Sequence, residues 1–294
     1  FIGRPLSQML ADAGHDLSLT SRSGAGVLRG VVTIPADLLQ PEAARQLCQG
    51  MDVVFHLAGI AHQQAAAVDY QRLNVDASLV LAEAAMACGA ETFVYVSSSR
   101  AAVGDSTSDH YGRSKFSAET ALRERIGTSA MRLVIVRPSL VYGANVKGNL
   151  ALLARFVRAH LPLPPEMGRR SMIGVEDLCR LLVQVAGSGD SSLPILPVTD
   201  GESYSTRRIV AALRVAAGQS ASGYTLPLWC WQLGSRLLDL FRGMPAGTHY
   251  GKLFHDDVCE DNAVAAVPNW TPRQVFEDVA QEIVLRPTGT GRAA

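Results

Sequence analysis

Short runs of β-branched and aromatic residues alternate with longer helical patterns through the first half of the chain. Apolar spacing from Met9 to Ala13 predicts a helix at the start, and the Ala-rich stretch 69–88 predicts a long one. The run 51–57 is apolar almost throughout, which is typical of a strand buried on both faces of a parallel sheet. Further strands are predicted at 17–20, 31–34, 93–96 and 133–137, and a further helix at 109–125. This alternation predicts an α/β fold with a doubly wound parallel sheet.

The second half is patterned differently and predicts a smaller, mostly helical part. Helices are expected at 149–160, 175–185, 206–217 and 228–242 and from near Pro272 on, with a Pro-rich loop at 161–170 and a strand at 195–198. The larger domain is predicted to comprise 1–148 and 171–199, and the smaller one 149–170 and 200–285. The tail 286–294, rich in Gly, Thr and Arg, is predicted to be disordered.

The chain opens on Phe1-Ile2-Gly3 and enters a helical pattern at once, without a start methionine. A doubly wound sheet has a strand before its first helix, so the first strand is expected to be missing from this sequence. Either the chain is a fragment or residues were removed from its front, and a targeting signal upstream stays open.

Composition narrows the classes of partner. Hydrophobic residues make up 48% and charged residues 18%, as in an ordinary globular protein with a sizeable core. A net charge of +0 provides no electrostatic reason to expect nucleic acid or an anionic membrane as a partner, and no stretch is long enough to predict stable membrane insertion. The cysteines form no CxxC pair and the histidines lack a ligand spacing, so no metal is expected and a reducing cytoplasm is the default.

Small and polar residues gather where the predicted strands end. They are Arg22, Asp37, Ala58, Gly59, residues 97–99 and Ser139. Ligands of doubly wound sheets bind beyond the carboxyl ends of the strands. The sequence therefore predicts a binding site at this edge of the sheet.

Tyr111 and Lys115 supply the candidate chemistry. Their four-residue step places the phenol and the ammonium on one face of the predicted helix. A cation nearby favours the phenolate, so Lys115 is expected to lower the pKa of Tyr111 and make it a proton shuttle for a carbinol. The spacing also occurs in surface helices without function, so it needs the support of the rest of the chain.

Six further segments accompany the YGRSK sequence of the Tyr111 helix in a fixed order. They are FIG at 1–3, HLAG at 56–59, NV at 74–75, SSS at 97–99, RPSLVYG at 137–143 and MIGVED at 172–177. Together they resemble the extended short-chain dehydrogenase/reductases, in particular the nucleotide-sugar branch of the NAD-dependent epimerase/dehydratase family. The resemblance covers most of the chain, up to about Trp270. It implies a Rossmann-like dinucleotide-binding domain and a smaller substrate domain.

The resemblance implies a role for each matched residue. Tyr111 would donate and accept the proton, Lys115 would also hold the nicotinamide ribose, and Ser99 would bind the reacting oxygen, with Ser98 its close rival. The implied cofactor-binding residues, besides Tyr111 and Lys115, are Ile2, Gly3, Arg22, Asp37, Leu38, Leu57, Ala58, Gly59, Asn74 and Pro138. The implied substrate-binding residues are Ser98, Ser99, Ser139, Asn149 and Arg170.

The cofactor is expected to be NADP or NAD. An acidic residue at the end of the second strand would bind the ribose 2′-hydroxyl of NAD, but Ser21-Arg22 stands there instead. An arginine beside a serine suits the 2′-phosphate of NADP.

The expected reaction is reduction of a UDP-4-keto-6-deoxy-N-acetylhexosamine at its 4-position. A UDP-hexose 4-epimerase is the alternative, and a non-catalytic NAD(P)-sensing protein is a remote one. A dehydratase is disfavoured because Arg100-Ala101 follows the serines where such enzymes carry an acidic pair. The implied partner is a small nucleotide sugar, and a homodimer is one expected assembly.

Several of these residues have a purely structural alternative. Asp37 and Asn74 can be helix caps or turn residues, and Arg170 can lie in a solvated loop. His62 is expected to be an ordinary loop histidine. The segment 228–242, with Trp229 and Trp231, is expected to be an amphipathic helix packed on its own domain rather than a membrane-surface helix.

Overall fold

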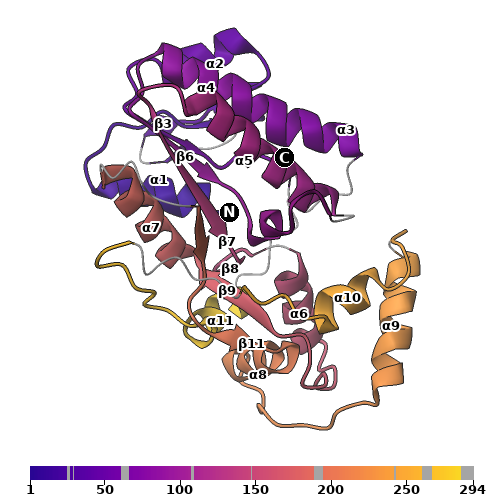
Figure 1. Ribbon diagram of the computed structural model, residues 1–294. Coiled ribbons are helices and arrows are strands. Elements are labelled where there is room, and N and C mark those ends of the chain that lie inside the picture. The colour runs from indigo at the N-terminus through magenta and orange to yellow at the C-terminus, as the bar shows by residue number, and fades with distance from the viewer. Residues whose placement is uncertain are drawn as a thin grey trace. The chain divides into compact units, whose positions relative to one another are not determined.

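The computed structural model describes residues 1–24, 27–28, 30–60, 66–106, 109–146, 148–188, 195–241, 243–259 and 267–285 (Figure 1). The chain forms two compact units. Unit 1 comprises Phe1–Ser139, Leu178–Val198 and Asp261–Trp270, and unit 2 comprises Leu140–Asp177, Thr199–Glu260 and Thr271–Ala294. The predicted disordered tail and His62 lie outside the described residues.

A four-stranded parallel sheet forms the centre of unit 1. Its strand order is β10-β7-β6-β5, with bounds Leu196–Val198, Arg132–Pro138, Thr92–Val96 and Val53–His56. β6 is buried along its whole length, as a strand covered on both faces must be. Helices α4 (Ala77–Ala87) and α5 (His110–Ile126) lie on one side of the sheet, and α1 (Gly3–Asp12) and α7 (Val175–Gly187) on the other (Figure 1). The predicted doubly wound parallel sheet is confirmed.

The start of unit 1 holds two small strand pairs. β1 (Thr20–Ser21) pairs with β4 (Ile34–Pro35) in parallel, and β2 (Val27–Leu28) pairs with β3 (Val31–Val32) in antiparallel. The single strand predicted at 31–34 is thus divided between two pairings. Within the described ranges, β5 is the edge of the four-stranded sheet, and no strand takes the place of the expected first one.

The long helix predicted at 69–88 is divided into three pieces. α3 (Ala67–Tyr70) leads into a π-helical turn, Gln71–Asp76, before α4 begins. A π turn inserts a residue and rotates the side chains that follow it. Here it buries Asn74, which is 1% exposed, toward the end of β5. α2 (Pro41–Cys48), which the sequence analysis did not predict, packs against α4.

The described residues of unit 2 form a three-stranded sheet and five helices. The strand order is β11-β9-β8, with bounds Ser203–Tyr204, Arg170–Gly174 and Leu140–Tyr142. The helices are α6 (Asn149–Arg158), α8 (Thr206–Ala216), α9 (Leu228–Phe241), α10 (Thr248–Phe254) and α11 (Phe276–Leu285). The core joins apolar faces of α6, α8 and α11.

Three details of unit 2 differ from expectation. The first boundary lies at Ser139 instead of residue 148, because β8 pairs with β9 and not with the sheet of unit 1. For the same reason β9 belongs to unit 2. The last helix starts at Phe276 instead of near Pro272, because the Asp177 carboxylate accepts from the backbone N–H groups of Arg273 and Gln274 and holds them outside the helix.

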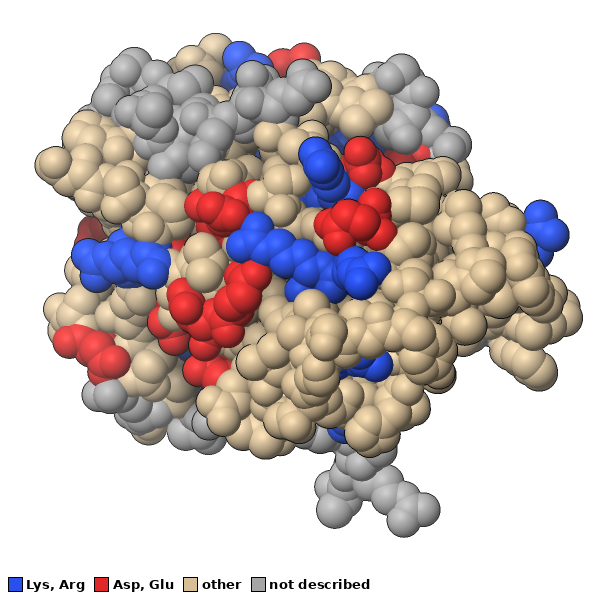
Figure 2. Space-filling model, turned by 90° about the horizontal axis from the view of Figure 1, so that it is seen from below, with Lys and Arg blue, Asp and Glu red and all other residues tan. Residues whose placement is uncertain are grey.

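Helix α9 is oriented contrary to its prediction. Its buried residues are Ser235 and Asp239, whereas Trp229, Leu233 and Leu237 are exposed. Trp231 packs against the core of unit 2 as expected, but the other large apolar side chains of the predicted packing face are exposed. Seen from below, charged side chains gather at the centre of the face, and the right-hand part, on the side of α9 in Figure 1, is largely uncharged (Figure 2). None of the helices in the described parts of the chain is long and apolar enough to cross a bilayer.

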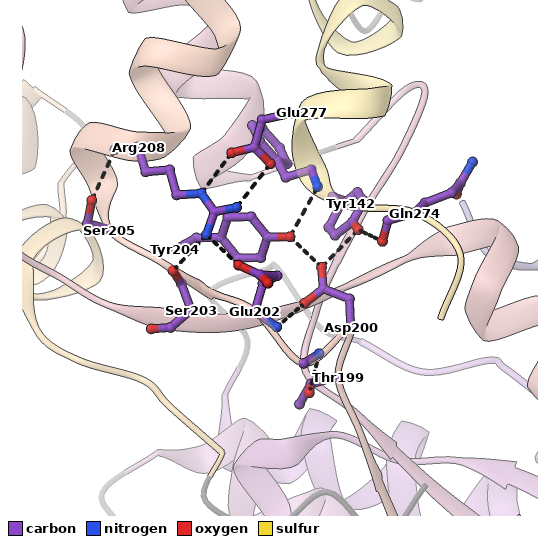
Figure 3. A network of polar contacts seen from close by, with 12 residues as sticks. Tyr142, Thr199, Asp200, Glu202, Ser203, Tyr204, Ser205, Arg208, Gln274 and Glu277 are labelled. Carbon is purple, nitrogen blue, oxygen red and sulfur yellow. Dashed lines mark hydrogen bonds and ion pairs between the residues drawn. The ribbon is translucent and has the colours of Figure 1, made fainter. Parts of the chain in front are cut away.

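A polar network around Asp200 joins β8, β11 and α11 (Figure 3). The hydroxyls of Tyr142 and Tyr204 donate to Asp200 Oδ2 at 2.9 and 2.7 Å, and the Tyr204 hydroxyl accepts from the Phe276 N–H at 3.1 Å. Arg208 pairs with Glu277 at 2.7 Å, with its guanidinium 4.4 Å from the Tyr204 ring centroid. The hydrogen bonds of this network offset the cost of burying the Asp200 carboxylate, whose pKa is raised by burial.

Candidate active site

Asn74 connects the end of β5 to helix α5. Its side-chain oxygen accepts from the Ile60 N–H at 2.8 Å, and its amide nitrogen donates to the Ile60 carbonyl at 3.1 Å and to Ser114 Oγ at 2.9 Å. Ser114 lies next to Lys115 on α5 and donates to the Tyr111 carbonyl at 2.8 Å. The alternative that Asn74 is only a helix cap is wrong, because it has no capping bond and holds Ile60 instead.

Lys115 is 5% exposed and lies beneath the end of β6. Its Nζ donates to the Val96 carbonyl at 2.9 Å and stands 4.6 Å from the Tyr95 ring centroid. Burial lowers the pKa of Lys115 to about 8, although the nearby Glu119 carboxylate opposes this change. The ammonium is thus buried and donates to a backbone carbonyl rather than being solvated at the surface.

Gly59 has no side chain that would crowd Asn74 and Lys115. A Cβ at this position would stand 2.8 Å from Asn74 Oδ1 and 3.7 Å from Lys115 Nζ, and its φ of +154° disfavours other residues. Ala58 and Gly59 are both exposed. The backbone at the end of β5 is therefore open to a close approach by a ligand.

Tyr111 lies in the first turn of α5, where Asp109 caps the helix. The Asp109 carboxylate accepts from the N–H groups of Tyr111 and Gly112 at 3.2 and 3.1 Å and pairs with Arg100 at 2.8 Å. Burial raises the pKa of Tyr111 above its usual range, while a hydrogen bond with Ser98 and the charge of Arg100 act in the other direction.

One expectation about Tyr111 needs correction: burial raises the pKa of Tyr111, and the Lys115 ammonium donates to the Val96 carbonyl. Of the two serines predicted for the reacting oxygen, Ser98 hydrogen-bonds Tyr111 and Ser99 opens the 3-10 turn that follows, and the choice between them for that oxygen stays a prediction. Both serines are half-buried.

A buried ion pair close to Lys115 was not predicted from the sequence. Glu119 is 2% exposed, accepts from Arg137 Nε at 2.9 Å and is hydrogen-bonded by Ser97. It follows Lys115 by four residues, a spacing that could have revealed it. His56 is also buried, with Nε2 2.8 Å from Ser78 Oγ, and burial together with the charge of Lys115 lowers its pKa to about 3.

The other predicted cofactor residues of unit 1 lie in several separate segments of the chain. Gly3 begins α1 after Ile2, and a Cβ on it would stand 3.6 Å from a Leu57 methyl. Arg22 is exposed in the turn after β1. Asp37 is exposed and accepts from the Leu39 N–H at 3.1 Å as a turn residue. Leu38 packs against the core, and Pro138 is buried at the end of β7.

The predicted substrate residues lie in different surroundings. Ser139, in unit 1, is 6% exposed, and its hydroxyl has no hydrogen-bond partner among the described residues. Asn149, in unit 2, is the first residue of α6. Arg170 is not in a solvated loop: it is 5% exposed, and its guanidinium donates to Lys252 O at 2.9 Å, Leu253 O at 2.7 Å and Thr206 Oγ1 at 3.0 Å. Binding a diphosphate would require Arg170 to leave these acceptors.

The acidic, histidine and cysteine side chains in the described parts of the chain form no cluster that could hold a metal. The parallel sheet, with a lysine under the end of β6 and a tyrosine one turn earlier on α5, is a Rossmann-like arrangement of the kind that binds dinucleotides. The chain belongs to the NAD dependent epimerase/dehydratase family, whose model matches residues 1–195. The predicted family and the predicted nicotinamide cofactor are thereby confirmed.

Two relatives of the chain are named for different enzymatic activities. The chain is 30% identical over 207 residues to a UDP-glucose 4-epimerase of Vibrio cholerae, covering 63% of each protein. It is 33% identical over 154 residues to a ceramide reductase of Caulobacter vibrioides, covering 52% of this chain and 46% of the relative. The chain thus matches less than two thirds of the length of these relatives.

Solved structures share the fold at lower identity. MoeE5 in complex with UDP-glucose and NAD superposes with a TM-score of 0.75 at 20% identity, covering 97% of this chain and 94% of that one. The UDP-glucose 4-epimerase of Thermus thermophilus in complex with NAD also gives 0.75, at 21% identity, covering 99% and 96%. These likenesses show the extended Rossmann-like fold.

Proposed function

We propose that this protein transfers hydride and a proton at carbon 4 of a nucleotide-linked sugar, reducing a UDP-4-keto-6-deoxy-N-acetylhexosamine. The observation that carries the proposal is the convergence of Tyr111, Ser98 and Lys115 at the ends of β5 and β6. Ser139, Asn149 and Arg170 are proposed to bind the sugar nucleotide, with Arg170 released from its carbonyl acceptors.

The residues of unit 1 fit a nicotinamide dinucleotide. Gly59 leaves an open strand end where a Cβ would crowd Asn74, and Lys115 Nζ has three donors, of which the Val96 carbonyl takes one. The remaining donors suit ribose hydroxyls. When bound, the nicotinamide supplies or accepts the hydride. The protein's own residues then position the sugar and move the proton.

Tyr111 is proposed to give its proton to the carbonyl oxygen at carbon 4. Because burial raises the pKa of its phenol, Tyr111 carries a proton at neutral pH and starts as a donor. Ser98 can donate to the same oxygen and hold it against the phenol. A reductase begins with this donation, whereas an epimerase begins by removing a proton from a hydroxyl. A protonated phenol suits the donating role that we propose for Tyr111.

A UDP-hexose 4-epimerase is the second candidate. It is favoured by the 30% identity to the Vibrio cholerae enzyme and by the UDP-glucose bound in MoeE5. An epimerase restores its cofactor in every cycle and gains from never releasing it, whereas a reductase must exchange it. A non-catalytic sensor is disfavoured, because binding alone does not need the complete set of Ser98, Tyr111 and Lys115.

The deciding experiment assays the purified protein with UDP-4-keto-6-deoxy-N-acetylhexosamines and with UDP-glucose, each with NADPH or NADH. We expect stoichiometric NADPH consumption with the keto sugar and no interconversion of UDP-glucose and UDP-galactose. Tyr111→Phe should lower turnover by roughly 10²–10⁴-fold, while Tyr224→Phe, an exposed tyrosine, should not. Hexose interconversion without added cofactor would overturn the reductase in favour of the epimerase. Full activity of Tyr111→Phe would remove Tyr111 from the chemistry.

A further inference from the structure

Lys115 and Glu119 are bound to consecutive residues at the end of β6. Lys115 Nζ donates to the Val96 carbonyl at 2.9 Å, and the Ser97 hydroxyl donates to Glu119 Oε1. Both side chains come from α5 at a four-residue step, so they lie on the same face of the helix. They are 5% and 2% exposed. A buried cation and a buried anion therefore meet the same strand end from adjacent turns of one helix.

Arg137 of β7 also binds the Glu119 carboxylate. Its Nε lies 2.9 Å from Oε1 and 3.1 Å from Oε2, and its Nη2 lies 2.5 Å from Oε2. Stability alone gives little reason for such a buried ion pair, because apolar residues of similar volume often stabilise a core as well. The position of the pair, one helical turn from Lys115, suggests a role in the site itself.

Glu119 is the only negative charge among the described groups that face Lys115 near neutral pH. The Tyr95 ring of β6 lies 4.6 Å from Nζ. His56 of β5 is uncharged, because burial and the charge of Lys115 lower its pKa to about 3. The phenols of Tyr95 and Tyr111 are uncharged as well, because burial raises the pKa of both. Burial lowers the pKa of Lys115 to about 8, and the charge of Glu119 acts against this loss of the proton.

We propose that Glu119 is a positioning residue for Lys115: its carboxylate keeps the lysine charged at the end of β6, where the ammonium holds the ribose of the nicotinamide cofactor. This role rests on the proposed function, in which Lys115 donates to that ribose. A charged ammonium has three donors and makes stronger hydrogen bonds than the neutral amine does. Arg137 acts in the opposite sense to Glu119, because its positive charge lies against the same carboxylate and repels the ammonium.

NMR titration of the whole chain, labelled with isotope-enriched lysine and free of cofactor, measures the charge of Lys115. The chain contains three lysines, so Lys147→Arg and Lys252→Arg assign the signals. The Lys115 signal should titrate near pH 8 in the wild type. Glu119→Gln should move this midpoint down by about one pH unit, and Arg137→Gln should move it up. Both variants break the same ion pair, so a purely structural role would not move the midpoints in opposite directions.

Glu83→Gln is the matched control, because it removes an acid of unit 1 that pairs with Arg125 at the surface. It should leave the Lys115 midpoint at its wild-type value. Equal midpoints in the wild type, Glu119→Gln and Arg137→Gln, or shifts of both variants in one direction, would overturn the proposal. If Glu119→Gln does not fold, Arg137→Gln decides alone: an upward shift supports the role, and any other result contradicts it.

Cofactor binding is the second measurement. Fluorescence titration with NADPH and with NADH should show affinity that weakens by about tenfold as Lys115 loses its proton, at the midpoint that NMR gives for each variant. Affinities that ignore these midpoints would overturn the positioning role. Neither measurement needs turnover, so failure of the proposed function is recognised separately. In that case the midpoints and affinities behave as expected while the keto sugar is not reduced.

Discussion

At the scale of single residues, burial decides the protonation of the candidate active site. It lowers the pKa of Lys115 to about 8 and that of His56 to about 3, and it raises that of Tyr111. In each case the charged form is disfavoured because water is excluded. The buried Glu119–Arg137 pair lies below these groups. The site therefore rests with a protonated phenol and a neutral imidazole at neutral pH.

His56 should make stability depend on pH. Because its pKa is lowered from 6.5 to about 3, the unfolded chain takes up a proton below about pH 6.5 that the folded chain refuses. The stability that neutral His56 allows is present above pH 6.5 and is lost as pH falls toward 3. Between about pH 7 and about pH 5 this group should lower the free energy of unfolding by about 2 kcal/mol.

Urea unfolding of the wild type and His56→Gln at both pH values measures this contribution. The variant should lose less stability on acidification than the wild type does. His15→Gln serves as the control, since His15 is exposed and should leave the dependence unchanged. If the wild type and His56→Gln lose stability in parallel, His56 does not carry the effect.

At the scale of elements, the start of helix α5 positions Tyr111, the proposed proton donor. Asp109 accepts two of the N–H groups that a helix start leaves without a partner, including that of Tyr111 itself. Gly112, next in the chain, allows close packing, because a Cβ there would stand 2.7 Å from the Arg100 carbonyl. The helix cap Asp109 and Tyr111 are therefore part of one local unit.

Asp109→Ala should destabilise the protein by about 1 kcal/mol through loss of the cap. It should also reduce turnover, because the Tyr111 backbone loses its hydrogen bond. Asp109→Asn keeps an accepting oxygen at the same place and should recover most of both losses. Chemical denaturation and a turnover assay on the two variants check this. Equal losses in both variants would mean that the charge, through Arg100, matters more than the cap.

At the scale of the whole molecule, the chain consists of two units with separate cores. The predicted cofactor residues all belong to unit 1, whereas Asn149 and Arg170 belong to unit 2. A ligand that binds the folded form stabilises it in proportion to the logarithm of its concentration. Cofactor binding should therefore raise the thermal stability of unit 1.

NADPH should stabilise the protein more than NADH at the same concentration, because exposed Arg22 suits a 2′-phosphate. At about 100 times its Kd a ligand contributes about 2.7 kcal/mol. Arg22→Ala should bring the two cofactors close together, whereas Arg45→Ala, another exposed arginine of unit 1, should not. Thermal denaturation with each cofactor measures the difference. Equal shifts of the wild-type Tm with NADPH and NADH would exclude this role for Arg22.

Much of unit 1 was predictable from the chain alone. The predicted strands at 93–96 and 133–137 agree with β6 and β7 to within a residue, because buried parallel strands are continuous apolar runs. The helix predicted at 109–125 agrees with α5 to within a residue at each end. The hydrogen bonds of the helix join neighbours along the chain, so the local sequence determined it, whereas the strands pair with partners about forty positions away and were recognisable only by their apolar runs. The order of the motifs likewise identified the family.

Only the tertiary structure decided which side chains meet. Ser98 and Ser99 are adjacent and alike, and the path of the chain after β6 turned one of them to Tyr111. The acceptors of Arg170 at 252–253 lie more than eighty positions away in sequence, so no local pattern showed them. An amphipathic pattern defines two faces of α9 but not which one turns inward. The contact between Asp239 and His249 decided that. Burying a carboxylate without its partner would cost more free energy than leaving the leucines exposed to water.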